Sequence, residues 1–221
     1  MRFFTMHLAG SVASLAGVQY DAAPSVLPVP TRSMIIGMLG GAMGWSYRDH
    51  ALLQELQDEL DLGFVVHNAG TVIWDFQTTD MTKPHMVGAI WTLDADGSLG
   101  VFKRAGGGKS RDTADRPLTC GIDITAVVGV ERDPERLLAT LRRPVFPVTL
   151  GRRGMFPTDP IAGETLDVGS VAEGVELVAS RRPGSRWTPV SVAGPGIHRT
   201  VPGGRDWGTR RHGGSDTYAV A

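Results

Sequence analysis

The chain has 221 residues, of which 42% are hydrophobic, and a formal net charge of −1. This is enough apolar material for one large domain or two small ones, and the net charge alone does not indicate a polyanion partner. The single cysteine, Cys120, excludes an internal disulfide and a cysteine-based zinc site, and it fits a reducing compartment.

Charge is distributed unevenly along the chain. Residues 1–80 carry three arginines and eight acidic residues, a net charge of −5, whereas residues 181–221 carry seven arginines and two aspartates, a net charge of +5. This asymmetry predicts a surface with a basic side. No apolar run approaches the ~18 residues of a membrane span, and the alternating stretch Met1–Leu8 is unlike a signal peptide. We therefore expect a cytoplasmic protein without a membrane partner.

The first elements lead into a glycine-rich helix. Arg2–Gly10 reads as a buried strand, and the small, proline-spaced stretch Ser11–Val29 reads as a loop. Within Pro30–Trp45, the hydroxyls of Thr31 and Ser33 are able to cap a helix whose apolar residues begin at Met34 and recur at helical spacing.

Four glycines lie on neighbouring turns of this helix: Gly37, Gly40, Gly41 and Gly44. Because each costs roughly 1 kcal/mol relative to alanine in a helix, the four together need a reason. One reason is close packing of the helix on a sheet. Another is the approach of a phosphate to the helix start, where Thr31, Arg32 and Ser33 offer free N–H groups and a cation. The two are compatible.

A second helix and two strands are expected next. A leucine stripe at Leu52, Leu53, Leu56, Leu60 and Leu62 predicts an amphipathic helix that ends at Gly63, with Gln54, Glu55, Gln57, Asp58 and Glu59 facing solvent. Phe64–His67 and Thr71–Gln77 read as strands, and Asn68-Ala69-Gly70 between them predicts a tight hairpin.

Residues 81–118 predict a protruding, partly flexible basic arm. Strands at Val87–Leu93 and Leu99–Arg104 flank a turn-like stretch, and Ala105–Lys109 is mostly glycine. The Gly-Lys-Ser at 108–110 is not a phosphate-binding loop of the nucleotide-hydrolysing type. Lys103 stands where that motif needs its first glycine, and no helix is expected after Ser110.

The remaining pattern completes a fold. Cys120–Val130 is a β-branched strand, Asp133-Pro134-Glu135 starts a helix, and Pro144–Leu150 is expected to be a strand. The order strand–helix–strand–strand–helix–strand predicts an α+β, ferredoxin-like (RRM-like) domain over residues 1–162, with the arm inserted at about 81–118. Residues 163–221 are expected to form a small β-rich lobe in which Asp216–Val220 is one strand.

Two groups of side chains favour nucleic-acid binding. Arg152 and Arg153, with a glycine on each side, follow the expected strand and could meet a polyanion backbone, although a simple charged corner explains them about as well. Trp187, Trp207 and Tyr218 lie among the C-terminal arginines, a mixture that stacks bases, although filling of a small core accounts for the tryptophans equally well.

No catalytic or cofactor site stands out. The six histidines are scattered without metal-ligand spacing, so we expect no metal and no cofactor. His85 beside Lys83 could carry out acid–base chemistry on RNA, but a solvated loop histidine is the better interpretation.

Five stretches together resemble a known family. They are residues 30–44, Leu52–Leu60, Asp75-Phe76-Gln77-Thr78, Leu150-Gly151-Arg152-Arg153 and Arg205-Asp206-Trp207. In order and spacing they are similar to the CasD-type subunit of the CRISPR surveillance complex Cascade (type I-E-like), a member of the RAMP superfamily of RNA-binding ferredoxin-like proteins.

The resemblance implies a non-catalytic RNA-binding subunit. Such subunits grip the 5′ handle of the CRISPR RNA, cap the filament of backbone subunits, contact the large subunit, and take part in target DNA interference indirectly. The arm would be the family's hairpin thumb, and handle contacts would come from the Arg152–Arg153 corner with Thr31, Arg32 and Ser33 as neighbours. The arm residues expected to meet RNA phosphates are Lys103, Arg104, Lys109, Arg111 and Arg116.

Two alternatives stay open. A sister branch of the family cuts repeat RNA without metal through a Tyr/Lys/His group, for which Tyr47, Lys83 and His85 are the candidates here. The chain could also be a general RNA-binding module outside CRISPR.

Overall fold

The computed structural model describes residues 1–15, 17, 25–80, 91–93, 99–101, 111–190, 196–209 and 211–221, with backbone alone at 77–80, 91–93, 99–101, 111–115 and 212. Its elements are β1 (Arg2–Ala13), α1 (Arg32–Ala42), α2 (His50–Glu59), β2 (Asp61–Asn68), β3 (Thr71–Asp80), β4 (Trp91–Leu93), β5 (Leu99–Val101), β6 (Arg111–Val130), α4 (Pro134–Arg142), β7 (Ala162–Leu166), α5 (Val171–Arg181), β8 (Ser185–Pro189), β9 (Ile197–Pro202), β10 (Arg205–Asp206), β11 (Arg211–His212) and β12 (Ser215–Val220).

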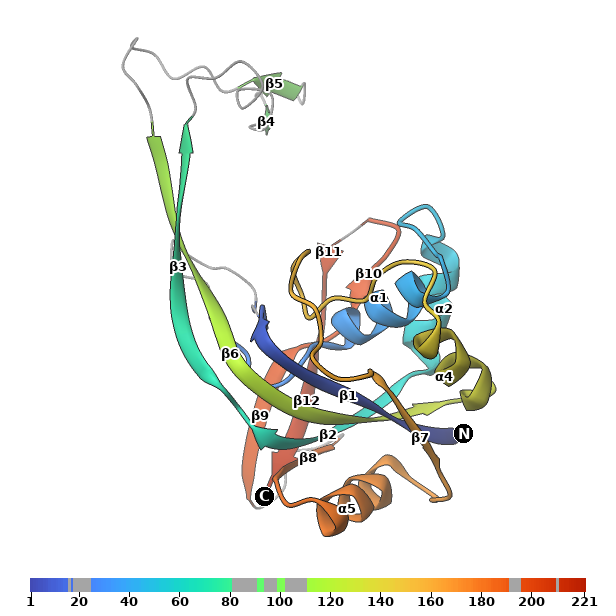
Figure 1. The fold of residues 1–221 in the computed structure, drawn as a ribbon. Helices are drawn as coiled ribbons and strands as arrows, with labels where there is room; N and C mark the ends of the chain where they lie inside the picture. The colour runs from blue at the N-terminus through green and yellow to red at the C-terminus, as the bar shows by residue number, and fades with distance from the viewer. Residues whose placement is uncertain are drawn as a thin grey trace.

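The sheet confirms the ferredoxin-like prediction. Its first four strands lie in the order β7-β1-β6-β2, and every neighbouring pair is antiparallel (Figure 1). Helices α1 and α2 connect β1 to β2, and α4 connects β6 to β7. This is the order and connectivity of a βαββαβ unit, in which β1 and β6 are the central strands.

Helices cover both faces of this sheet. Phe4, Met6 and Leu8 alternate along β1 and pack in the large core under α1, α2 and α4. Phe3, on the opposite face of the same strand, belongs to a smaller core under α5 with Val127. The period-2 alternation of the sequence therefore places the helices in two layers.

The strands beyond residue 162 extend the same sheet. β8 pairs with the free edge of β2, and β12 and β9 continue outward. Tyr218 of β12 is buried edge-on against Phe64 of β2, with ring centroids 5.6 Å apart. The expected strand at Asp216–Val220 is confirmed within β12, and β8, β9 and β12 share one sheet with the strands of residues 1–162.

The hairpin expected at Asn68–Gly70 is wrong. β2 and β3 do not pair with each other, because both pair with β6 in line, with Asn68 opposite Asp123 and Thr71 opposite Cys120. Gly70 turns the chain at a φ of 73°, where a Cβ would lie 2.5 Å from the Cys120 carbonyl oxygen. Asn68, Ala69 and Gly70 therefore form a kink between two strands that pair in succession with the same side of β6.

Beyond this kink, β3 and β6 leave the sheet as a two-stranded ribbon that projects far from the helices (Figure 1). The paired ribbon begins at residue 71 and ends at residue 120, so its base lies closer to the sheet than the expected boundaries of 81 and 118. β4 and β5 pair with each other, and each lies within one of the two strands expected at Val87–Leu93 and Leu99–Arg104. Residues 81–90, 94–98 and 102–110 of the predicted arm lie outside the described residues.

Two further local predictions are corrected. Pro144–Leu150 is an irregular segment, because Pro144 and Pro147 lack an N–H while Val145 and Phe146 donate theirs to Ala42 and Gly41 at the end of α1. Helix α2 ends at Glu59 instead of Gly63, which lies in β2. A Cβ at Gly63 would lie 2.7 Å from Val171 and Val175, so this glycine lets α5 approach the sheet.

None of the helices in the described ranges combines the length and the apolar character that crossing a bilayer needs.

Candidate nucleic-acid interface

The N-terminus of α1 is capped by a hydroxyl group, as predicted. Thr31 is the N-cap, and its Oγ1 accepts a hydrogen bond from the backbone N–H of Met34 at 3.2 Å. The same oxygen lies 3.1 Å from Oγ of Ser33. The two hydroxyls therefore organise the first turn, and Thr31 alone has the cap geometry.

The glycines of α1 separate into two groups. Gly40 faces α2, and a Cβ there would lie 2.5 Å from the Leu53 side chain, so this glycine serves close packing. Gly37 and Gly41 have nothing within 4 Å of an added Cβ, because they face an open pocket. Gly44 follows the helix at a φ of 83°. The packing explanation therefore accounts for one glycine, and an open face accounts for two.

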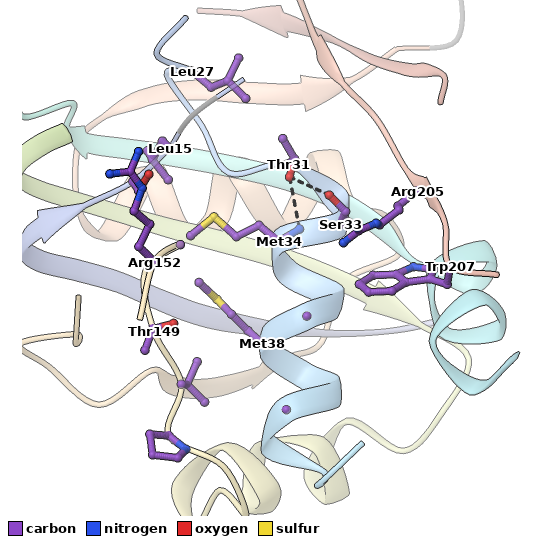
Figure 2. Close-up of a pocket in the computed structure, with 16 residues that line it drawn as sticks. Leu15, Leu27, Thr31, Ser33, Met34, Met38, Thr149, Arg152, Arg205 and Trp207 are labelled. Carbon is purple, nitrogen blue, oxygen red and sulfur yellow. Dashed lines mark hydrogen bonds between the residues drawn. The ribbon is translucent and has the colours of Figure 1, made fainter. Parts of the chain in front are cut away.

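This pocket has a volume of about 520 Å³ (Figure 2). Four segments surround it: the two residues after β1, the stretch from Leu27 through α1 to Gly41, residues 147–152, and the start of the β10–β11 ribbon. Its lining residues are Ser14, Leu15, Leu27, Thr31, Ser33, Met34, Gly37, Met38, Gly41, Pro147, Val148, Thr149, Gly151, Arg152, Arg205 and Trp207.

A pinned turn brings Arg152 to the pocket. Leu150 accepts a hydrogen bond from Ser14 at 2.9 Å and donates one to Met155 at 2.7 Å, so the turn is fixed to the end of β1. Gly151 and Gly154 both adopt positive φ, 96° and 93°. A Cβ at Gly151 would overlap the Ser14 carbonyl oxygen. Two glycines are therefore needed for a turn that follows no strand.

The electrostatic surroundings of Arg152 are basic. Burial lowers the pKa of its guanidinium from the usual value, the charge of Arg116 lowers this pKa further, and the carboxylate of Asp75 opposes both effects. Arg116 and Asp75 face each other across the base of the β3–β6 ribbon. The charge of Arg116, at the base of the ribbon, therefore reaches Arg152; both are predicted RNA contacts, and of the two Arg152 lines the pocket. Arg153 is exposed beside the pocket and does not line it.

Arg205 and Trp207 form the opposite side of the pocket (Figure 2). The Arg205 guanidinium lies over the Trp207 ring, 5.4 Å from its centroid. The sequence pattern predicted base stacking for Trp207 and gave Arg205 no binding role. The available signal was the spacing of Arg205 and Trp207, two positions apart among the C-terminal arginines.

Arg32 is engaged inside the protein. Its guanidinium contacts both carboxylate oxygens of Asp216, at 3.2 and 3.1 Å, and donates to the backbone carbonyl of Leu60. Its side chain is 20% exposed. Arg32 therefore joins α1 to the end of α2 and to β12, and it does not line the pocket.

The other predicted residues are only partly described. Lys103, Arg104 and Lys109 lie outside the described residues, as does the Gly-Lys-Ser at 108–110, and Arg111 is described by its backbone at the end of β6. Of the ribonuclease candidates, Tyr47 is 59% exposed beside Arg48, and Lys83 and His85 lie outside the described residues.

The pocket offers a cation, hydroxyls, thioethers and an indole. This set suits a ligand with both a phosphate and an aromatic ring. Among the residues that the structure describes, no three His, Cys, Asp or Glu side chains gather in a way that could hold a metal ion.

Comparisons with known proteins agree with the fold. None of the curated proteins matches the chain. A chain of the solved structure "CRISPR RNA-guided surveillance complex" is 20% identical with a TM-score of 0.64, over 99% of this chain and 89% of that one. A chain of the "Crystal structure of Cas protein" is 18% identical with a TM-score of 0.59, over 99% of this chain and 92% of that one. Residues 5–214 match the family described as CRISPR-associated protein (Cas_Cas5). Since this match spans nearly the whole sequence, the chain belongs to the Cas5 family of CRISPR-associated proteins.

Proposed function

We propose that the chain is a non-catalytic, RNA-binding subunit of a type I CRISPR surveillance complex (Cascade), of the CasD type. In this role it grips the 5′ handle of the CRISPR RNA and caps the filament of backbone subunits. The observation that carries the proposal is the pocket at the start of α1, which Arg152 and Arg205 line together with thioether and indole surfaces. Membership of the Cas5 family and the similar fold of a surveillance-complex chain support it.

The chemistry of the pocket fits single-stranded RNA. Sequence-dependent RNA recognition usually involves unpaired nucleotides, whose bases stack on apolar side chains while cations hold the phosphates. A pocket of about 520 Å³ lies in the size range of small-ligand sites. The α1 face beside it carries Gly37 and Gly41, which leave the helix backbone open to close approach.

The remaining parts of the proposal concern partners. The arm, with Lys103, Arg104, Lys109, Arg111 and Arg116, would fold over the RNA beside the first backbone subunit. The protein would also contact the large subunit, take part in target DNA interference indirectly, and act in the cytoplasm. Membership of the Cas5 family argues against a general RNA-binding role outside CRISPR.

The test compares complexes assembled on CRISPR RNA with and without the 5′ handle. We expect retention of the chain to depend on the handle, and indifference to the handle would overturn the proposal. Arg152→Ala should weaken handle retention about 10-fold at moderate salt, because a desolvated cation is lost. Arg136→Ala on α4 is the charge-matched control, since Arg136 is exposed and does not line this pocket.

A second assay separates binding from catalysis. Purified protein is incubated with repeat RNA in the presence of a chelator. We expect intact RNA, and metal-independent cleavage that is lost in Tyr47→Phe would replace the non-catalytic proposal with an endoribonuclease.

A further inference from the structure

The β10–β11 ribbon is fixed to α2 by one buried glutamine. Gln57 is only 7% exposed, although its place in the helix pattern predicted a solvent-facing residue. Its Nε2 donates to the carbonyl oxygen of Arg205 at 2.9 Å, and its Oε1 accepts from the backbone N–H of Arg205 at 2.9 Å. The side chain thus pairs with residue 205 as a neighbouring β-strand would.

The same carboxamide orients Trp207. Gln57 Oε1 accepts a hydrogen bond from the indole Nε1–H at 3.1 Å, and Gln54 Oε1 accepts one from the backbone N–H of Trp207 at 3.3 Å. A Cβ at Gly204 would lie 2.6 Å from Gln57 Nε2, so this glycine admits the amide. These hydrogen bonds hold both the backbone and the ring nitrogen of Trp207, which fixes the position and the rotation of the indole.

Apolar packing alone would not require this arrangement. A leucine at position 57 would fill the same space and hold the ribbon by burial, whereas a buried amide costs desolvation free energy and gains orientation. The oriented surface is the Arg205–Trp207 pair, whose cation lies over the ring at the edge of the pocket.

We propose that the Arg205–Trp207 pair is a stacking wall for one unpaired nucleobase, and that Gln57 is the positioning residue that holds this wall. The inference rests on the proposed RNA-binding function. The base would lie between the wall and the thioethers of Met34 and Met38. Figure 2 shows Arg152 and Trp207 on opposite sides of this methionine stretch, so the attached phosphate would point toward Arg152.

The lining also indicates how selective this subsite is. Met34, Met38 and Trp207 offer polarisable and aromatic surface, which binds the face of any base. We therefore expect stacking with little discrimination between base edges, and tighter binding of purines than pyrimidines because their rings are larger.

The test is an abasic scan of RNA. The probe is a synthetic copy of the 5′ end of the CRISPR RNA that copurifies with the protein, with one base removed at a time. For the full-length wild-type chain, removal at one position should weaken binding about 5- to 100-fold. We call this ratio of affinities for intact and abasic RNA the base effect. In Trp207→Ala the base effect should disappear, because the stacking partner is already missing. Arg205→Ala should give a partial loss, and Arg211→Ala, a charge-matched change outside the pocket lining, should keep the full base effect.

The abasic scan also tests Gln57. In Gln57→Leu the base effect should shrink to nearly that of Trp207→Ala, while the salt dependence of binding should remain that of wild type. The double variant should show no greater loss than either single variant. Leu52→Gln, a change at an exposed position of α2, is the control and should leave the base effect intact.

Two results separate this inference from the proposed function. If no abasic position couples to Trp207 while Arg152→Ala still weakens handle binding, the stacking wall is wrong and the RNA-binding function stands. If neither the handle nor Arg152 affects binding, the proposed function itself fails. Trp207→Phe, which keeps an aromatic ring, should retain most of the base effect, and a complete loss there would also contradict stacking.

Discussion

At the scale of single residues, the two glycines beside Arg152 have unequal roles. Both adopt positive φ, but only Gly151 has a neighbour in the way of a side chain, the carbonyl of Ser14. Gly151→Ala should lower the free energy of unfolding by about 2–3 kcal/mol, from backbone strain and displacement of the turn. Gly154→Ala should lower it by about 1 kcal/mol, since nothing lies within 4 Å of the added Cβ.

Chemical denaturation of the two variants checks this difference. Because Gly151 also positions the following residue, Gly151→Ala should reduce handle binding as Arg152→Ala does, whereas Gly154→Ala should not. Equal destabilisation by the two substitutions would show that the contact with β1 does not hold the turn.

The sequence predicts Arg152 and Arg153 as a pair of RNA contacts and does not distinguish them. Their difference depends on the turn, whose shape is set by contacts with β1, more than 130 residues earlier in the chain. Arg32 shows the same limit, because its partner Asp216 lies 184 residues away. Residue type predicted a cation in each case, and tertiary contacts determined which cations reach the pocket.

At the scale of elements, α1 presents two glycines, Gly37 and Gly41, on the face that lines the pocket. Gly37→Ala should raise the free energy of unfolding by about 0.5–1 kcal/mol, because the site is helical, open and free of clashes. Gly37→Leu would instead fill part of the pocket, so we expect RNA binding to fall about 10-fold without loss of stability.

Ala51→Leu is the matched control for the larger substitution, since it adds an apolar side chain to an exposed helical position of α2 away from the pocket. Thermal melts and RNA titrations on the same samples separate the two effects. If Gly37→Leu binds handle RNA as tightly as wild type, this face of α1 is not part of the interface.

Elements with local signals were predicted well. The cap at Thr31 and the Asp133-Pro134 start of α4 are confirmed, because each depends on residues within one turn. The hairpin at Asn68–Gly70 failed because β2 and β3 share a partner, β6, which lies about 50 residues further along the chain. The strand expected at Pro144–Leu150 failed because Val145 and Phe146 donate their N–H groups to α1, and the two prolines have none to donate. Gln57 was misassigned because its partners lie 148 and 150 residues away.

At the scale of the whole molecule, one sheet joins the N-terminal and C-terminal halves. The ferredoxin-like order could be predicted from the succession of elements, since β7-β1-β6-β2 follows from short connections through helices. The extension through β8, β12 and β9 could not, because pairing of β8 with the edge of β2 has no local signal in either strand. The C-terminal segment thereby supplies Arg205 and Trp207 to a pocket whose other lining residues lie between positions 14 and 152.

The ribbon offers a test of the whole arrangement. Asp80 of β3 and Arg111 of β6 are paired, so residues 81–110 can be replaced by Asn-Gly, which favours a two-residue turn between antiparallel strands. We expect the shortened protein to melt within a few degrees of wild type, because the described cores lie in the sheet and its helices.

Assembly with CRISPR RNA should be lost, since Lys103, Arg104 and Lys109 are removed, while the pocket with Arg152 remains. Binding of a short handle RNA by the shortened chain should therefore persist and still depend on Arg152. Full assembly of the shortened chain would remove residues 81–110 from the proposed RNA contacts, and loss of short-handle binding would place the main contact in the arm instead of the pocket.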